Sequence, residues 1–249
     1  MANGFGQGFL KNSLVLGGGF NFGFYTPPSA IPQSGLLLHL DAGNATSYPG
    51  SGNTWFDLAS SPTANDATLV NTPTYSTNNG GYFTFAKASS ESATVSGTNV
   101  VPSAAYTKAV WFNLTDTASD NNLVSSDPGG HFMFFGSTNK LYCGHANWTA
   151  GLGYFQYPST ANFSANIWYL AVLTYTTADG MTLYINGTLD STYTANKTAH
   201  IGDGSTNIGR FGAGNFLNGS IAQVLTYDRA ISSAEVTSIY DATKSRYGL

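Results

Sequence analysis

A short aromatic and polar segment in the middle of the sequence carries the residue types that bind sugars. Residues 145–149 read His-Ala-Asn-Trp-Thr, and a tyrosine follows at position 154. An exposed aromatic ring can pack against the apolar face of a sugar, and neighbouring amides can bond its hydroxyl groups. We therefore take Asn147, Trp148 and Tyr154 as candidate glycan-binding residues. The alternative for Trp148 is packing within the fold or at a subunit interface.

The carboxylates lack the pairing that glycoside hydrolysis requires. A glycosidase uses two carboxyl groups roughly 5–10 Å apart on either side of the scissile bond. The chain has only two glutamates, and Glu235 follows Ser232 at the spacing of a helix capping box. Glu91 precedes a predicted strand, and no Asp-x-Asp or Asp-x-Glu pair occurs. We therefore expect a protein that is not an enzyme and has no catalytic residues.

Four histidines and one cysteine are the remaining reactive side chains. His39 lies inside an apolar run, which favours a structural role over that of a base. His131 and His145 lie on two predicted strands and could pair across them, although neither they nor His200 have an adjacent carboxylate in the sequence. Cys143 is the only cysteine and cannot form an internal disulfide, so we expect it to be buried.

The composition indicates one all-β domain built from many short strands and turns. Asn, Thr, Ser and Gly account for 106 of the 249 residues, 14% are aromatic and 9% are charged. These four residue types are weak helix formers and are common in turns. The aromatic content is too high for a disordered chain. A length of 249 residues is normal for a single β-sandwich or barrel.

Charge and hydropathy exclude several kinds of partner. The net charge is −4, and nine dispersed basic residues form no stripe that could follow a nucleic acid backbone. No apolar run approaches the about 18 residues that cross a bilayer, so we expect no membrane insertion. The first residues lack a basic segment followed by an apolar one, so we expect no signal peptide and synthesis in the cytoplasm.

The first 34 residues differ from the rest because aromatic residues alternate with glycines. Exposed apolar surface of this density favours association. We interpret residues 1–34 as an extended N-terminal arm that docks on another subunit or on a neighbouring protein. The alternative is an extra strand packed on its own domain. The aromatic residues of the arm are Phe5, Phe9, Phe20, Phe22, Phe24 and Tyr25.

From Gly35 to the C-terminus, alternating or apolar runs are separated by strong turn signals. Asn186-Gly187 between two such runs predicts a two-residue hairpin turn of type I′. One short helix is predicted after Ser232 and is expected to cover an edge or end of a sheet. The predicted strands are Leu36–Leu40, Ala67–Val70, Tyr82–Phe85, Ser92–Val95, Ala109–Leu114, His131–Phe135, Leu141–His145, Gly153–Tyr157, Trp168–Tyr175, Met181–Ile185, Leu189–Tyr193 and Ile221–Tyr227.

Together these segments resemble the laminin-G-like domains of the concanavalin A-like lectin/glucanase superfamily, over about residues 35–249. The final segments, YDRAIS (227–232) and KSRYGL (244–249), resemble the variant found in virion proteins of tailed bacteriophages. The other segments are LLLHLDAGN (36–44), SYPGSGNTWFDL (47–58), NGGYFTF (79–85), WYLAVLTY (168–175), LYING (183–187), IGR (208–210) and FLNGSIAQV (216–224).

The resemblance implies a two-sheet antiparallel jelly-roll sandwich. Domains of this kind often hold one structural calcium ion at the rim, which makes Asp41 a candidate metal ligand. The alternative is that Asp41 stabilises a turn by bonding its own backbone. We expect no other cofactor.

The resemblance also sets the expected function. Our first hypothesis is a non-enzymatic virion protein of a tailed phage, expected to decorate the capsid, with the arm binding other virion proteins and driving homo-oligomer formation, for example a trimer. The alternative is a carbohydrate-binding module or a tail or fibre component that recognises host surface glycans.

Overall fold

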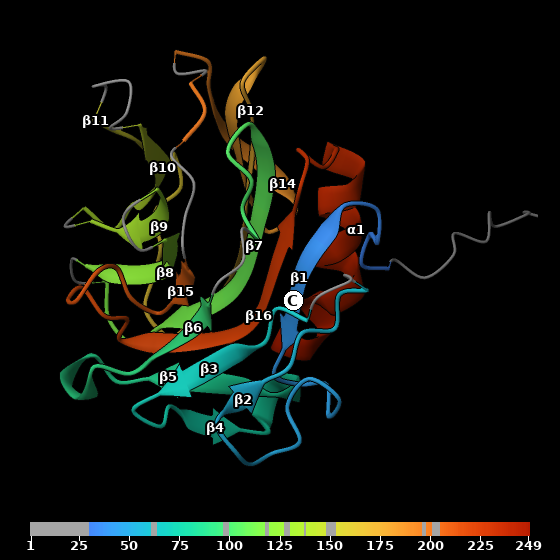
Figure 1. Ribbon diagram of the computed structural model, residues 1–249, viewed down its shortest axis with the longest axis vertical. Coiled ribbons are helices and arrows are strands. Elements are labelled where there is room, and N and C mark those ends of the chain that lie inside the picture. The colour runs from blue at the N-terminus through green and yellow to red at the C-terminus, as the bar shows by residue number, and fades with distance from the viewer. Residues whose placement is uncertain are drawn as a thin grey trace, which may run out of the picture.

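Two antiparallel sheets of eight strands face each other across one apolar core (Figure 1). The computed structural model describes residues 30–60, 64–96, 100–117, 120–126, 130–136, 138–147, 153–195, 198–200 and 205–249. The predicted jelly-roll sandwich is confirmed. The aromatic residues of the arm, from Phe5 to Tyr25, lie outside the described residues.

Sheet A is organised around the long strand β16. It runs in the order β14-β13-β12-β7-β16-β5-β4, and β1 pairs with β16 beside β5. One edge of β16 pairs with β7 along its length, while residues 219–221 of the other edge pair with β5 and residues 223–227 pair with β1. The strands are β1 (Leu36–Asp41), β4 (Thr74–Ser76), β5 (Tyr82–Phe85), β7 (Ala105–Leu114), β12 (Trp168–Thr176), β13 (Gly180–Ile185), β14 (Thr188–Tyr193) and β16 (Gly219–Tyr227).

Sheet B forms the other layer, in the order β11-β10-β9-β8-β15-β6-β3-β2. Its strands alternate between the core and the outer face, because successive side chains of a strand point to opposite sides. In β9, for example, Met133 and Phe135 enter the core, so Phe132 and Phe134 face outward. The strands are β2 (Thr54–Trp55), β3 (Ala67–Val70), β6 (Ser92–Ser96), β8 (Asn121–Ser126), β9 (His131–Phe135), β10 (Leu141–Asn147), β11 (Gly153–Pro158) and β15 (Ser205–Ile208).

The predicted strands are all present, and the Asn186-Gly187 turn has the positive φ angles of 51° and 78° that a type I′ hairpin requires. Four strands were not predicted: β2, β4, β8 and β15. They are short or rich in Asn and Ser, as in the Asn-Asn-Leu-Val-Ser-Ser sequence of β8, so their intrinsic strand preference is weak. Pairing with neighbouring strands holds them in the sheets.

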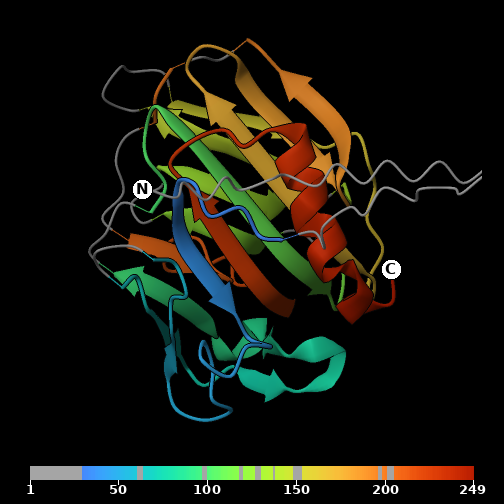
Figure 2. The same ribbon diagram turned by 90° about the vertical axis from the view of Figure 1, so that its right-hand side faces the viewer.

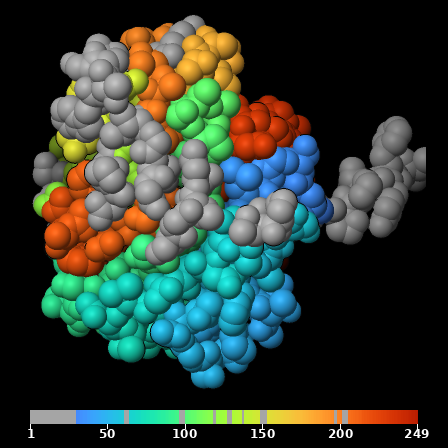
Figure 3. All heavy atoms as spheres, viewed as in Figure 1, coloured from blue at the N-terminus to red at the C-terminus, as the bar shows by residue number. Residues whose placement is uncertain are grey.

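The helix α1 (Ser233–Thr243) begins with the predicted capping box: Ser232 accepts from the Glu235 backbone, and Glu235 accepts from the Ser232 backbone. Its predicted position was wrong. It lies across the outer face of sheet A rather than at an edge, as Figure 2 shows, and it buries Val236 and Ile239 against β7, β12 and β16. Figure 3 shows the helix (red) beside β1 (blue) at the surface.

Three short 3₁₀ helices complete the described structure: η1 (Asn78–Gly80), η2 (Lys87–Ser89) and η3 (Lys244–Tyr247). None of the helices in the described ranges is both long enough and apolar enough to cross a membrane.

Trp111 of β7 packs against the C-terminal segment and is hydrogen-bonded to it. Its ring is fully buried and stacks on Tyr247, with ring centroids 4.1 Å apart. Its Nε1 donates a hydrogen bond to Oγ1 of Thr243 over 2.8 Å, and that hydroxyl in turn donates to the carbonyl of Ile239. The hydroxyl thus satisfies the only polar atom of the buried indole.

We expect Thr243→Val to destabilise the protein by about 1–3 kcal/mol, because it keeps the shape of the side chain but leaves the indole N–H buried without an acceptor. Thr237→Val is the matched control. Thr237 lies on the exposed side of the same helix, so its loss should stay within about 0.5 kcal/mol. Equilibrium unfolding in urea measures both. Equal stabilities of the two variants would contradict this role of Thr243.

Candidate functional site

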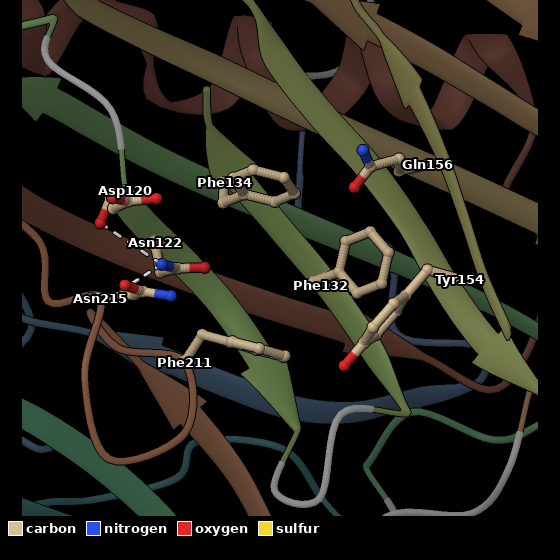
Figure 4. Close-up of a pocket in the computed structure, with 8 residues that line it drawn as sticks. All are labelled: Asp120, Asn122, Phe132, Phe134, Tyr154, Gln156, Phe211 and Asn215. Atoms are coloured by element: carbon tan, nitrogen blue, oxygen red, sulfur yellow. Dashed lines mark hydrogen bonds between the residues drawn. The ribbon is translucent and has the colours of Figure 1, made fainter. Parts of the chain in front are cut away.

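A pocket of about 160 Å³ opens on the outer face of sheet B, on the side of the sandwich opposite the helix (Figure 4). Strands β8, β9 and β11 contribute its floor and two sides, and the loop after β15 completes it. The loop is closed by a bridge between Phe211 and Gly214. The lining residues are Asp120, Asn122, Phe132, Phe134, Tyr154, Gln156, Phe211 and Asn215.

Aromatic rings occupy the centre of the pocket. The Phe132 ring lies with its centroid 5.7 Å from that of Tyr154, 5.8 Å from that of Phe134 and 6.4 Å from that of Phe211, each pair meeting edge to face. Phe134 also stacks on Tyr142 of β10 at 5.4 Å. These rings form one continuous aromatic surface. They come from the neighbouring strands β9 and β10, from β11, and from the loop that contains Phe211.

Two glycines make room for these rings on the sheet. Gly144 of β10 lies between Phe132 of β9 and Gln156 of β11 in the pairing register. A Cβ atom at Gly144 would lie 1.8 Å from the carbonyl oxygen of Phe155 and 2.8 Å from the Phe132 ring, and one at Gly136 would lie 2.6 Å from the Tyr142 ring. Because both positions lack a side chain, the two rings lie over the backbone instead of standing away from it.

Polar groups flank the aromatic surface on both sides (Figure 4). Asn122 is 3% exposed, and its Nδ2 donates to the backbone carbonyls of Asn215 at 2.8 Å and Asp120 at 3.4 Å. These bonds fix the amide so that Oδ1 points toward the rings. Asp120 adopts a left-handed conformation with φ 69° at the start of β8, and Gln156 lies on the opposite side of the pocket.

The structure separates the three predicted glycan-binding residues. Tyr154 lines the pocket and is 50% exposed. Asn147 at the end of β10 donates from Nδ2 to the carbonyl of Ala199 instead, 2.5 Å away, and is not among the lining residues. Trp148 lies outside the described residues. The glycan-binding role of each residue stays a prediction.

Most of the pocket was not identified from the sequence. The outward position of Phe132 and Phe134 could have been predicted, because these two aromatic residues alternate with core residues in one strand and must face outward. No local sequence pattern indicated that Asn122 and the Phe211–Asn215 loop would line the pocket. They reach the pocket only through the pairing of β8 with β9 and of β15 with β8.

A second group of reactive side chains is buried between the sheets. His131 and His145 are paired across β9 and β10, as their spacing suggested, and the ring of His200 lies 5.7 Å and 5.8 Å from theirs. Lys108 of β7 is also fully buried, with Nζ 3.4 Å from Nδ1 of His131 and 3.1 Å from the carbonyl of Phe132.

His145 is held by hydrogen bonds at both ring nitrogens. Nδ1 lies 3.1 Å from the hydroxyl of Tyr106, and Nε2 lies 2.8 Å from the carbonyl of Thr198, which makes Nε2 the donor and Nδ1 the acceptor. Burial, together with the charges of His200 and Lys108, lowers the pKa of His145 to about 3, although the hydrogen bond to Thr198 acts in the opposite direction. The ring is therefore neutral and inaccessible in the folded protein, which indicates a structural role.

Cys143 is buried in the same layer, as predicted, and burial raises its pKa to about 12. It is therefore a protonated thiol at neutral pH. The described ranges contain no group of three or more His, Cys, Asp or Glu side chains that could hold a metal ion.

Asp41 is engaged with the C-terminal segment. Its two carboxylate oxygens each accept a hydrogen bond of 2.9 Å from Arg246, and Oδ1 also accepts from the backbone of Gly43, the turn contact given as the alternative role. A calcium ion at Asp41 would have to displace the guanidinium. The calcium site stays a prediction, and these contacts argue against it. His39 lies beside this pair, 3.1 Å from Gln223, and burial lowers its pKa.

The carboxylates of the described residues give the pocket no catalytic pair. Asp120 is the only acid among the described residues that line it. Glu91 accepts a hydrogen bond from the backbone of Ala86, and Glu235 pairs with Arg229 at the start of α1, which lowers the pKa of Glu235 to about 2. Each glutamate therefore serves local structure.

Comparison with known proteins gives a family and a fold. The laminin-G family described as the concanavalin A-like lectin/glucanases superfamily matches residues 87–237, more than half of the chain. No curated protein sequence matches it.

Solved structures match at low identity. The binding domain of botulinum neurotoxin serotype G has a TM-score of 0.64 and 14% identity, over 82% of this chain and 50% of that one. The binding domain of botulinum neurotoxin DC, solved in complex with SialylT, has a TM-score of 0.64 and 12% identity, over 84% and 51%. A Trypanosoma rangeli sialidase in complex with the inhibitor DANA has a TM-score of 0.59 and 15% identity, over 85% and 33%.

These likenesses show the jelly-roll fold alone, because the identities are low. The chain spans about half the length of the neurotoxin binding domains it matches and a third of the sialidase.

The buried histidines predict a protein that loses stability in mild acid. The folded-state pKa of His145 is about 3 and its ordinary value is 6.5, so between these values only the unfolded chain takes up the proton. The stability contributed by neutral His145 is thus complete above pH 6.5 and falls by about 1.4 kcal/mol for each pH unit below it.

Urea unfolding between pH 7 and pH 4.5 measures this slope. The amide of Gln in the variant His145→Gln can donate and accept hydrogen bonds but does not titrate. The decrease in unfolding free energy per pH unit should therefore be smaller in the variant by about 1.4 kcal/mol, the contribution of one proton, even if the variant is less stable at pH 7. A wild-type stability that does not change over this range would contradict the assignment.

Proposed function

The chain belongs to the laminin-G family of the concanavalin A-like lectin/glucanases superfamily, and on this premise we propose that it is a carbohydrate-binding domain whose ligand occupies the aromatic pocket of sheet B. The observation that carries the proposal is the combination of an aromatic floor with polar groups on both sides of it. A pyranose ring presents apolar C–H groups on its faces and hydroxyls around its edge, and this pocket offers partners for both.

The exposure of the aromatic residues supports a binding role. Tyr154 is half exposed, and Phe134 and Phe211 are partly exposed on the outer face of the sheet. Gly136 and Gly144 have no side chains, so the rings of Tyr142 and Phe132 lie directly against the sheet. Among the structural neighbours, one neurotoxin binding domain was solved in complex with SialylT and one sialidase in complex with the inhibitor DANA, and this chain matches 51% and 33% of those two chains.

We infer that binding occurs without hydrolysis. Asp120 is the only carboxylate among the described residues that line the pocket, whereas a glycosidase needs two across the scissile bond. His131, His145 and His200 are buried on the other side of sheet B, and His39 lies on β1 of sheet A. Glycans incubated with the protein should therefore be recovered intact.

A second candidate role is display on a virion, which the resemblance of the chain's ending to tailed-phage proteins suggested. The position of residue 30 favours such a role. The carbonyl of Ala30 accepts from Oγ of Ser238 in α1, and Ile31 packs against the helix-side core. The N-terminal segment therefore joins the domain on the face opposite the pocket. Anchoring through residues 1–29, on a capsid protein or on other copies of this chain, would leave the pocket directed away from the particle.

We expect Tyr154→Ala to weaken glycan binding by about tenfold, the equivalent of about 1.4 kcal/mol, because it removes the most exposed aromatic ring that lines the pocket. A glycan array identifies the ligand, and isothermal titration calorimetry then measures its affinity for both proteins. Phe56→Ala is the matched control, since Phe56 is 41% exposed but does not line the pocket. If the two variants lose glycan affinity equally, or if neither loses affinity, the glycan binds outside the pocket.

The display role predicts that oligomer formation depends on the N-terminal segment. Light scattering should show the full chain as an oligomer and the fragment 30–249, which retains both sheets and α1, as a folded monomer. Circular dichroism checks the folding of the fragment. If the full chain is a monomer that also fails to bind phage particles, this role is excluded while the glycan-binding proposal is unaffected.

A further inference from the structure

We propose that the pocket selects uncharged sugars and excludes acidic ones, namely those that carry carboxylate, sulfate or phosphate groups. This inference rests on the proposed glycan-binding function and names the chemical class of its ligand. It follows from the polar atoms of the pocket, from its charge and from the faces of its aromatic rings.

The polar atoms that are fixed in position are acceptors. The Nδ2 group of Asn122 is committed to two backbone carbonyls, so its Oδ1 faces the rings and makes no hydrogen bond with the described residues. The carboxylate of Asp120 can only accept. Sugar hydroxyls can donate to both groups, whereas an ionised carboxylate or sulfate cannot donate to either. The acceptors of Asn122 and Asp120 therefore match the hydroxyl donors of a polyol, while the side-chain amides of Asn215 and Gln156 can both donate and accept.

The charge of the pocket points the same way. Among the residues that the structure describes, no lysine or arginine lines the pocket and Asp120 forms no ion pair. Arg210 precedes Phe211, but its guanidinium donates to Oδ1 of Asn207 at 3.0 Å and 3.1 Å. An acidic sugar in this pocket would meet a like charge without a lining cation to balance it.

The aromatic rings add to this selectivity. The face of a phenyl ring carries partial negative charge, so it attracts the slightly positive C–H groups of a sugar and disfavours an anion. Phe132, Phe134, Phe211 and Tyr154 surround the centre of the pocket. An anionic substituent would thus be unfavourable both beside Asp120 and over the rings.

The test compares matched glycans on the full-length protein. An array pairs each neutral oligosaccharide with the same oligosaccharide carrying a terminal sialic acid, a uronic acid or a sulfate, at 0.15 M salt. We expect neutral members to bind at least about tenfold more tightly than their acidic counterparts. Asp120→Asn should reduce this ratio, because it removes the charge and keeps an amide that tolerates positive φ. Asp228→Asn, which removes an exposed charge outside the pocket, should leave the ratio unchanged.

The outcomes separate this inference from the function on which it rests. Preferential binding of acidic glycans, with loss in Tyr154→Ala, would overturn the inference and retain the glycan-binding function. Neutral selectivity that Asp120→Asn does not reduce would overturn the role of Asp120. If the wild-type protein binds no glycan of either kind, the proposed function fails and the inference fails with it.

Discussion

Strands β7 and β16 pair along their length, and both halves of sheet A are attached to this pair. The two strands are ten and nine residues long, and each is covered on both faces. One face of the pair packs into the core between the sheets, through residues such as Val110 and Val224, and the other packs under the C-terminal helix through Trp111 and Leu225. Because β12 extends the sheet from β7 while β1 and β5 extend it from β16, loss of this pairing would separate both halves of sheet A.

The helix and the pocket follow from an asymmetry between the two sheets. Sheet A is apolar on both sides and needs a cover, which the C-terminal segment supplies by placing Tyr240 and Tyr247 over Trp111 and Arg246 against Asp41. Sheet B has no such cover over β8 to β11 in the described structure. Its outer face instead carries aromatic residues that remain partly exposed. Partly exposed aromatic surface that the fold does not need for its own core is the feature that suggests a ligand.

The buried histidines show how polar groups are accommodated in this core. His131, His145 and His200 occupy one end of the space between the sheets, where the Tyr106 hydroxyl and backbone carbonyls bond to the rings of His145 and His200. Tyr175 donates to the carbonyl of Thr198, which also accepts from His145. Such a network costs little while the rings stay neutral and becomes unfavourable when they gain a proton, because a charge in a low-dielectric interior is poorly solvated. The same network places reactive groups where no ligand in the pocket can reach them, since sheet B lies between.

The fold class and most of the strands could be predicted from the sequence, because alternation and turn residues act over a few neighbouring positions. The Asn186-Gly187 hairpin and the capping box from Ser232 to Glu235 are local in this sense, and both formed as predicted. The helix position, the partner of Asp41 and the pocket could not be predicted, because each depends on contacts between distant parts of the chain. Arg246 is 205 residues from Asp41, and the Phe211–Asn215 loop reaches Phe132 through the pairing of β15 with β8 and of β8 with β9. Such contacts depend on strand order in the sheets, which local residue preferences do not encode.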